Sequence, residues 1–373
     1  MSTQPQVRLN LHPQASLTRE NPSLLTVRFS LMRQQITSRD PATLDALQRL
    51  AGEALSEDEL IRAANDNAPG VFYVLNQLHA LGLLWYTLLD DTAPIATFRP
   101  ISPRFAPRHW RLADDLRLSL SRFALCRRHT GQTVLDSPQA TAQVAIMQPA
   151  SLAPLWADTP LTADDYADRL SGHLGAATAR ALWGLLHHTG FLTIDQDGTS
   201  SEDADPIRHQ WTFHDALFHQ MSRLGQYQFL LNQPRSFPAH ISPQPATPPR
   251  RGTQLIPLPD VNSAAPDPPF AEVIAARHTT REFNDAAPID LAALGEWLHR
   301  AARATRDTQP ATPERPYEIG GRSYGGAGAC YELELYLTVR LCAGLPPGAY
   351  HYRAADHSLD VLPAPADPLQ RLF

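Results

Sequence analysis

The chain has 373 residues, enough for two or three domains, and its hydrophobic fraction of 43% is ordinary for a globular protein with sizeable cores. All 32 basic residues are arginines, so the sequence excludes a Schiff-base lysine, a P-loop lysine and a lysine general base. The formal net charge of −6 disfavours a protein that neutralises nucleic-acid phosphates over a long surface.

The three cysteines, Cys126, Cys330 and Cys342, are far apart and form no C-x-x-C pair. They predict neither a disulfide framework nor a zinc site, and they fit a reducing compartment. Residues 1–12 lack the apolar core of a signal peptide, and no segment approaches the roughly 18 apolar residues of a membrane span. We therefore predict a cytoplasmic protein with no metal site and no membrane contact.

Two segments of the front half, residues 55–84 and 161–192, resemble each other at a separation of a little over a hundred residues. In each segment a Ser or Thr is followed three residues later by an acid, which is the pattern of a reciprocal N-terminal helix cap. The pairs are Ser56 with Glu59 and Thr162 with Asp165. Each pair predicts the start of a short helix.

A second helix is predicted in each segment, over residues 71–81 and 176–188, from apolar residues at helical spacing. Gly82 and Gly190 are placed to end these helices, and an apolar stretch follows each glycine. Helix, helix, glycine and strand is the order of a winged helix. The sequence therefore predicts two tandem winged-helix-like domains.

Two functions are open for these modules. DNA binding is disfavoured, because the helix at 71–81 has no Arg and the helix at 176–188 has only Arg180, whereas a major-groove helix brings several donors. The alternative is an accessory domain whose exposed strand edge accepts a peptide as an added strand. The acidic net charge favours the peptide.

Histidines raise the question of metal or acid/base chemistry. His187 and His188 point about 100° apart on a helix, so they predict a surface or half-buried pair rather than a metal site. His214 and Asp215 could form an acid/base pair, but a capped amphipathic helix is favoured there. That helix would pack Trp211, Phe213, Leu217 and Phe218.

Prolines are dense from residue 232 to residue 269 and predict a semi-extended linker. Beyond it, Arg277 and Arg281 flank His278, Thr279 and Thr280, and guanidiniums with hydroxyls suit a phosphate. A solvated helix face is the plain alternative for two arginines four residues apart.

The rest of the tail predicts a helix over residues 290–303, capped by Asp290, and a small meander of strands at 331–341, 349–352 and 357–362. The Gly-Gly-Ala-Gly sequence at 325–328 lets main-chain N–H groups approach a flat ring, although a plain turn is an equally simple interpretation.

In this order, the motifs resemble the SagB/ThcOx-type dehydrogenases, nitroreductase-like flavoproteins that oxidise azolines to azoles during the maturation of ribosomal peptides. The resemblance covers about residue 205 to the end, and the tandem modules match the family's peptide-clamp architecture. The motifs are W-x-F-H-D-x-x-F-H-x-x-S-R at 211–223, R-H-T-T-R-x-F at 277–283, R-x-Y to Y-E-L-E-L-Y within 322–336 and G-L-P-P-G-x-Y-H-Y at 344–352.

The resemblance implies an FMN-dependent oxidoreductase that binds its flavin at the interface of a homodimer. Its partners would be a ribosomal precursor peptide with its leader and a cyclodehydratase, with no nucleic acid. The phosphate, ribityl chain and pyrimidine edge would contact Arg277, His278, Thr279 and Arg281. The loop with Gly326, Ala327 and Gly328 would lie against the isoalloxazine.

Two departures from the family's pattern leave catalysis open. The family's Pro-Ser-Gly-Gly is replaced by the sequence at 325–328, so a serine donor is missing. The family's domain also continues beyond the last predicted strand and includes a Lys-Tyr catalytic pair without a match here, so no catalytic residue is assigned. The alternatives are a non-catalytic leader-peptide-binding or scaffold protein with an inactive flavin domain, and a fragment of a longer enzyme.

The predicted fold class is therefore α+β. It comprises winged-helix-like domains at residues 1–110 and 115–200, a connecting helix and Pro-rich linker at 205–269, and a partial nitroreductase-like FMN domain at 270–373.

Overall fold

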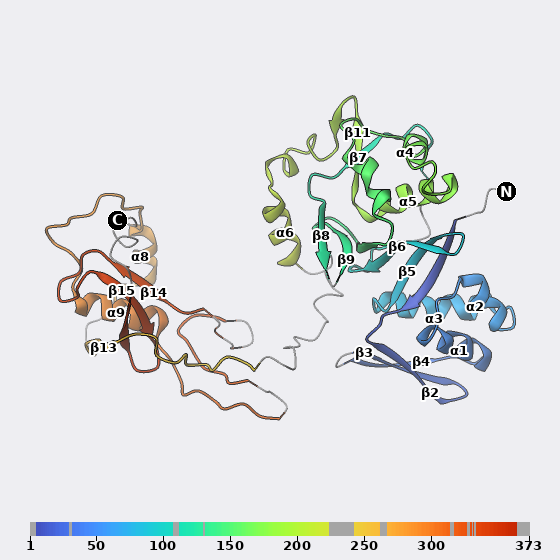
Figure 1. Ribbon diagram of the computed structural model, residues 1–373. Coiled ribbons are helices and arrows are strands. Elements are labelled where there is room, and N and C mark those ends of the chain that lie inside the picture. Colours follow the sequence, from blue (N-terminus) through green and yellow to red (C-terminus); the bar gives the residue numbers. More distant parts are fainter. Residues whose placement is uncertain are drawn as a thin grey trace. The chain divides into compact units, whose positions relative to one another are not determined.

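The computed structural model describes residues 5–29, 32–106, 112–129, 131–223, 242–261, 267–313, 317–326, 329, 331 and 333–363. The chain divides into two units, Met1–Arg235 and Ser236–Phe373 (Figure 1). Both units contain helices and strands, which confirms the mixed α and β composition. None of the helices in the described part of the chain combines the length and the apolar character needed to cross a membrane.

The first module of the first unit has four strands, four helical segments and a closing hairpin. In chain order these are β1 (Gln6–Leu11), β2 (Ala15–Asn21), β3 (Leu24–Phe29), β4 (Met32–Thr37), α1 (Pro41–Gln48), the 3₁₀ helix η1 (Arg49–Ala51), α2 (Glu57–Ala63), α3 (Ala68–Ala80), β5 (Leu84–Asp90) and β6 (Ala93–Pro100). Strands β2, β3 and β4 form a separate antiparallel sheet, and α1 contacts its β2 strand.

The second module repeats the strand, helix, helix and hairpin of the first. Its elements are β7 (Leu118–Leu120), η2 (Pro149–Trp156), α4 (Ala163–Arg169), α5 (Ala176–Thr189), β11 (Leu192–Gln196) and β12 (Thr199–Ser200). In both modules the strand before the helices pairs with the strand after them: β1 with β5, and β7 with β11. The first strand also bridges to the residue just before the first cap, as Leu9 to Leu55 and as Leu118 to Leu161. The repeat therefore begins one strand earlier than the sequence indicated.

The predicted helix caps of both modules are confirmed. Ser56 Oγ accepts from the Glu59 N–H at 3.2 Å, while the Ser56 N–H donates to Glu59 Oε2 at 2.7 Å. Thr162 and Asp165 exchange the same two bonds at 3.1 and 2.9 Å. Each cap satisfies N–H groups that the first helical turn leaves without a partner, which fixes where α2 and α4 begin.

The glycines that end the second helices are also confirmed. Gly82 has a φ of +71° and Gly190 a φ of +99°, backbone angles that side-chain-bearing residues rarely adopt. After each glycine the chain donates back into the helix, from Leu83 N to Leu78 O and from Phe191 N to Leu186 O. Helix α3 begins earlier than predicted because Asn67 caps it by accepting from the Gly70 N–H.

A six-stranded antiparallel sheet joins the two modules into one core. Its outer strands β8 (Leu125–His129), β9 (Gln132–Asp136) and β10 (Ala142–Ile146) continue the first module's hairpin, giving the order β1-β5-β6-β10-β9-β8. One buried cluster includes Phe98 of β6, Val144 of β10 and Trp183 of α5. The two modules and strands β9 and β10 therefore bury their apolar faces together.

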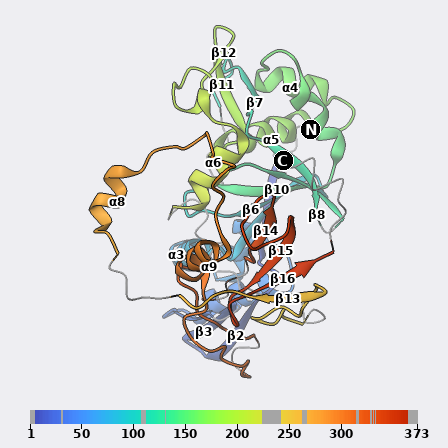
Figure 2. The same ribbon diagram turned by 90° about the vertical axis from the view of Figure 1, so that its left-hand side faces the viewer.

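The second unit is a four-stranded antiparallel sheet with one helix packed on it. The elements are β13 (Gln254–Pro257), α8 (Phe270–Ala276), α9 (Leu291–Ala302), β14 (Tyr336–Val339), β15 (Gly348–Arg353) and β16 (Ser358–Leu362), and the sheet order is β13-β16-β15-β14. Figures 1 and 2 both show α9 beside the sheet, where Leu298 packs with Tyr350 and Leu359. Asp290 caps α9 as predicted, with its Oδ1 accepting from the Ala293 N–H at 2.7 Å.

The predicted meander is confirmed in β14, β15 and β16, with two differences. The strand predicted over residues 331–341 is confined to β14, and at its predicted start Tyr331 has a φ of +45°, which is outside the extended region. Part of the Pro-rich stretch forms β13, an edge strand paired with β16. Proline is tolerated there because an edge strand has one side without ladder bonds, and Pro257 is its last residue.

A carboxylate at the end of β5 connects the two modules. Helix α5 begins at Gly175, which has no side chain to cap it. Asp90 takes that role from the other module: its Oδ2 accepts from the Gly175 N–H at 3.0 Å, and its Oδ1 accepts from Thr178 Oγ1 at 2.7 Å. The N-terminus of α5 is thus stabilised by a residue 85 positions earlier in the chain.

We expect Asp90→Ala to lower the free energy of unfolding of the first unit by about 1 to 2 kcal/mol, because the start of α5 loses its acceptor. Urea denaturation of the full chain, followed by circular dichroism, measures the change. Asp158→Ala, which removes an exposed loop carboxylate, is the control and should stay within about 0.5 kcal/mol of the wild type. Equal stability of both variants would contradict the capping role.

Candidate functional site

The histidine-containing segment at residues 211–223 forms a capped helix. Helix α6 (Phe213–Met221) begins at Thr212, whose N–H and Oγ1 both donate to Asp215 Oδ2 at 2.8 Å. These bonds from Thr212 lower the pKa of Asp215. The Asp215 carboxylate therefore serves the helix start, which confirms the capped helix over the acid/base pair with His214.

The predicted packing of this helix is partly wrong. Among its residues only Ala216 is buried, and Phe218 is 75% exposed. Phe218 lies two positions after Ala216, about 200° around the helix, so it points away from the face that meets the core. Sequence reasoning assumed that every large apolar side chain here faces inward.

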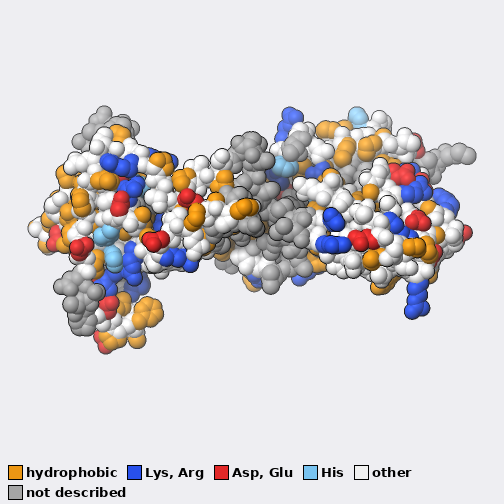
Figure 3. All heavy atoms as spheres, turned by 90° about the horizontal axis from the view of Figure 1, so that it is seen from below, with side chains coloured by type: hydrophobic (Ala, Val, Ile, Leu, Met, Phe, Trp, Pro, Cys, Tyr) orange, Lys and Arg blue, Asp and Glu red, His pale blue; other side chains and the backbone are white. Residues whose placement is uncertain are grey.

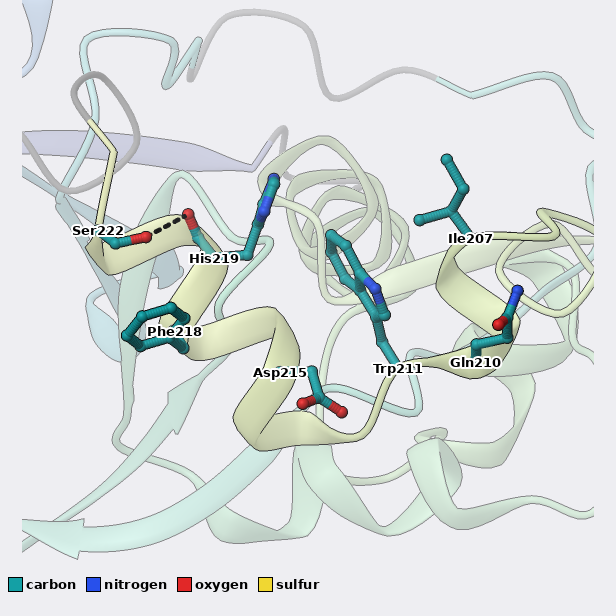
Figure 4. A pocket seen from close by; sticks show the side chains of 7 residues that line it. All are labelled: Ile207, Gln210, Trp211, Asp215, Phe218, His219 and Ser222. Carbon is teal, nitrogen blue, oxygen red and sulfur yellow. Dashed lines mark hydrogen bonds between the residues drawn. The ribbon is translucent and has the colours of Figure 1, made fainter. Parts of the chain in front are cut away.

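The exposed face of α6 and the segment before it line an open pocket. Figure 4 shows that the Trp211 and His219 rings lie on the same side of the helix, with ring centroids 4.7 Å apart and planes at 49°. Arg223 Nη1 lies 2.6 Å from His219 Nε2. The pocket is lined by Ile207, Gln210, Trp211, Asp215, Phe218, His219 and Ser222. Such a lining offers aromatic stacking and apolar contact with a few polar groups, which suits binding of a planar or apolar group.

One arginine fixes the approach of the chain to this pocket. Arg122, just after β7, donates from Nη2 to Trp211 O at 2.5 Å and from Nη1 to His209 O at 3.3 Å. Its Nη1 also binds Asp203 Oδ1 at 3.0 Å. Hydrogen bonds from a charged donor are stronger than neutral ones, so this side chain holds the backbone at 209–211, including the 3₁₀ helix η3 (Arg208–Gln210), against the second module.

A buried carboxylate positions Arg122 in turn. Glu202 is 3% exposed, and it accepts from Ser121 Oγ at 2.6 Å and from the Arg122 N–H at 3.1 Å. Sequence reasoning missed both Arg122 and Glu202. They lie about eighty residues apart and belong to no local motif, so no spacing rule could pair them.

The predicted phosphate-binding residues lie together on an exposed segment of the second unit. Arg277, His278, Thr279 and Arg281 follow the exposed helix α8, in a stretch without helix or strand. All four side chains are exposed, and His278 Nδ1 lies 3.1 Å from Ala276 O. Guanidinium and hydroxyl donors at this spacing fit a phosphate in chemistry. The described residues do not enclose them, so they provide no wall for a flat ring.

The predicted glycine loop is described only at Gly326, because Ala327 and Gly328 lie outside the described residues. The Gly326 backbone lies against Tyr331: a Cβ atom on Gly326 would stand 2.7 Å from Tyr331 Cδ1. Tyr331 in turn meets Tyr324 edge to face, with centroids 5.7 Å apart. A larger residue at this position would force the tyrosine ring or the backbone to shift.

The contacts of the two adjacent histidines of α5 indicate a structural role. His187 is half-buried, with Nδ1 3.2 Å from Leu192 O, and burial lowers its pKa. The two rings are 5.4 Å apart and tilted by 54°. Within the part of the chain that the structure describes, no three His, Cys, Asp or Glu side chains gather as a metal-binding group.

Comparison with known families matches residues 118–228 to the family described as cyanobactin oxidase ThcOx. The matched segment runs from β7 through the second module to the end of α6, so it contains Arg122, Glu202 and the Trp211 pocket. It confirms the resemblance to the SagB/ThcOx-type family. The match stops before the arginine segment at 277–281. No curated protein matches the chain.

We expect Arg122→Ala to loosen the segment at 209–221 without unfolding the unit. Loss of its charged hydrogen bonds should lower the local opening free energy by about 1 to 2 kcal/mol, which speeds amide exchange there roughly tenfold. Hydrogen–deuterium exchange with peptide-level readout measures this. Arg169→Ala, exposed at the end of α4, is the charge-matched control. Unchanged exchange at 209–221 would rule out the anchoring role.

Proposed function

We propose, from the match of residues 118–228 to the ThcOx family, that this chain is a cytoplasmic oxidase of ribosomal-peptide maturation that uses FMN to oxidise azolines to azoles. The match is the observation that carries the proposal. It covers the second module together with the pocket at Trp211, a concave surface with the lining expected of a binding site.

The chain's contribution to flavin binding would come from the exposed arginine segment. When bound, FMN supplies the hydride acceptor. Arg277 and Arg281 would bind its phosphate through paired N–H donors, with His278 and Thr279 toward the ribityl chain and the pyrimidine edge. Gly326, Ala327 and Gly328 would lie along the isoalloxazine.

A homodimer would provide a wall for the flavin that the described residues of one chain do not form. Large apolar side chains stand exposed beside the arginines, among them Phe270 of α8 at 78% and Phe283 at 79%. Hydrophobic side chains are spread over the surface of this unit (left in Figure 3). Exposed apolar groups rimmed by charges are typical of surfaces that a partner covers. A second copy would cover them and complete the flavin site.

We expect the double variant Arg277→Ala/Arg281→Ala to weaken FMN binding by about a hundredfold or more, since each charged hydrogen bond contributes about 1.5 to 3 kcal/mol. Quenching of flavin fluorescence on titration of the purified full chain measures the affinity. Arg300→Ala is the control, because it removes an exposed guanidinium on α9 that pairs with Asp267 and Glu296. A wild-type chain that stays colourless and does not quench FMN contradicts the cofactor proposal.

A second candidate function is non-catalytic binding of a precursor peptide, with a cyclodehydratase as the enzyme partner. The observation that favours it is the outer edge of β8, which pairs with no other strand among the described residues. Four of the five residues of β8 are exposed, and the strand lies within the family match. Unpaired N–H and C=O groups on an edge strand are a template for an added strand.

Addition of a leader-bearing precursor peptide should slow amide exchange across Leu125–His129 several-fold, because an added strand would hydrogen-bond the outer edge of β8. Strand β15 of the second unit, which is paired on both sides, serves as the internal reference. The same peptide with its residue order scrambled is the ligand control. Protection that is absent, or equal for both peptides, excludes this edge as the binding site.

A further inference from the structure

A second pocket lies in the first unit, on the face of the six-stranded sheet opposite to its core side chains. It has a volume of about 290 Å³, and its walls include His12, Phe29, Trp85, Arg99, Arg127 and Gln143. Neither the flavin proposal nor the Trp211 pocket uses any of these residues, and the inference below does not rest on either.

Strand register brings the polar side chains of this pocket together. Arg99 of β6 is directly opposite Gln143 of β10. The neighbouring pair of Tyr86 with Phe98 places Trp85 of β5 on the other side of Arg99. Directly paired residues share a face of a sheet, so the indole, the guanidinium and the amide form one row across three strands.

Arg99 is the unusual member of this row. Its guanidinium carbon lies 4.6 Å from the centroid of the Trp85 ring, and Nη2 donates to Gln132 Oε1. Its Nε is buried and has no hydrogen-bond partner. Among the described residues no carboxylate pairs with Arg99, so its positive charge has no compensating anion there. Burial also lowers the pKa of Arg99.

The other charged groups around the pocket do not supply that anion. The Asp136 carboxylate of β9 accepts from Arg127 Nη2 at 3.2 Å and from Gln143 Nε2 at 2.9 Å, so its charge is matched by Arg127. Burial, and then the charge of Arg99, lower the pKa of His12. Neutral His12 accepts from the Gln14 N–H at Nδ1, which leaves its hydrogen on Nε2 as a further donor.

Aromatic rings and apolar side chains form further walls of the pocket. The His12 ring meets Phe29 and Trp85 edge-on, with centroids 4.7 and 5.1 Å away. A group bound beside Arg99 would therefore contact aromatic rings as well as donors. Guanidiniums bind carboxylates through two parallel N–H bonds, and aromatic walls favour a planar or apolar body.

We propose that this pocket binds a carboxylate carried on a planar or apolar group, with Arg99 as its main donor. The same chemistry is offered by a free aromatic or branched small acid and by an acidic side chain next to an apolar one in a peptide. Arg99 takes the carboxylate as its counterion in either case.

Calorimetric titration of the full chain with benzoate tests the site, with benzamide as the uncharged ligand of equal shape. We expect saturable binding of benzoate, no detectable binding of benzamide, and a loss of affinity of at least about tenfold in Arg99→Gln. Arg128→Gln is the matched control: it removes a charge from the same strand as Arg127, on the opposite face, where Arg128 is exposed, and should bind like the wild type.

Two blocked tripeptides, Phe-Glu-Phe and Phe-Gln-Phe, distinguish a free small acid from an acidic peptide side chain as the source of the carboxylate. Tighter binding of the Glu peptide than of benzoate identifies a peptide side chain as the ligand, while the reverse identifies a free acid. Arg99→Lys, which keeps the charge but not the paired donors, guards against a folding defect and should bind more weakly than the wild type. Failure of both benzoate and the Glu peptide to bind the wild type overturns the proposal, as does wild-type affinity in a folded Arg99→Gln.

Discussion

The antiparallel pairing of β6 with β10 is the interaction on which the architecture of the first unit depends. Strand β6 is the second strand of the first module's hairpin, and β10 lies between β7 and η2 of the second module. Their ladder builds one six-stranded sheet, and both modules share one buried core, although β7, β11 and β12 of the second module form a separate sheet. The pairing also fixes which side chains lie side by side. Its register places Gln143 opposite Arg99, and both line the pocket around Arg99.

The same pairing makes the two modules unequal. In the first, the outer edge of the hairpin is covered by β10, so its backbone groups are used inside the sheet. In the second, the hairpin ends at the short strand β12, and exposed apolar side chains follow it in the chain at Ile207, Phe218 and Met221. The second module leads directly into the segment that lines the Trp211 pocket. The match to the ThcOx family covers both.

Sequence reasoning succeeded where the determining interactions are local. The caps at Ser56 and Thr162 join residues three positions apart, and the glycine at 190 follows from the backbone angle that ends a helix. The strands of the second unit's meander could be predicted for the same reason, because the alternation of side chains and the turn residues act over a few positions.

Sequence reasoning could not find contacts between residues that only the folded chain brings together. Asp90 caps a helix from another module, and Arg122 holds a backbone segment about eighty-five residues away. Residues 277–281 illustrate the converse. Their donor chemistry was evident from the sequence, but whether a cofactor has walls depends on surfaces that a local motif does not specify. Binding of a flavin therefore stays a proposal.

The exposed arginine segment is held at both of its ends by the same small domain. Leu258, just after β13, is buried in the core of the second unit, and Leu294 of α9 is buried in that core again after the segment. The intervening chain is a closed loop rather than a tail, so the arginines stay within a limited radius of the sheet. Loop closure restricts the volume a segment can explore, which raises the effective concentration of its groups toward anything bound beside that sheet. If a phosphate bound near α9, the guanidiniums of Arg277 and Arg281 would already be confined to its neighbourhood by the closed loop.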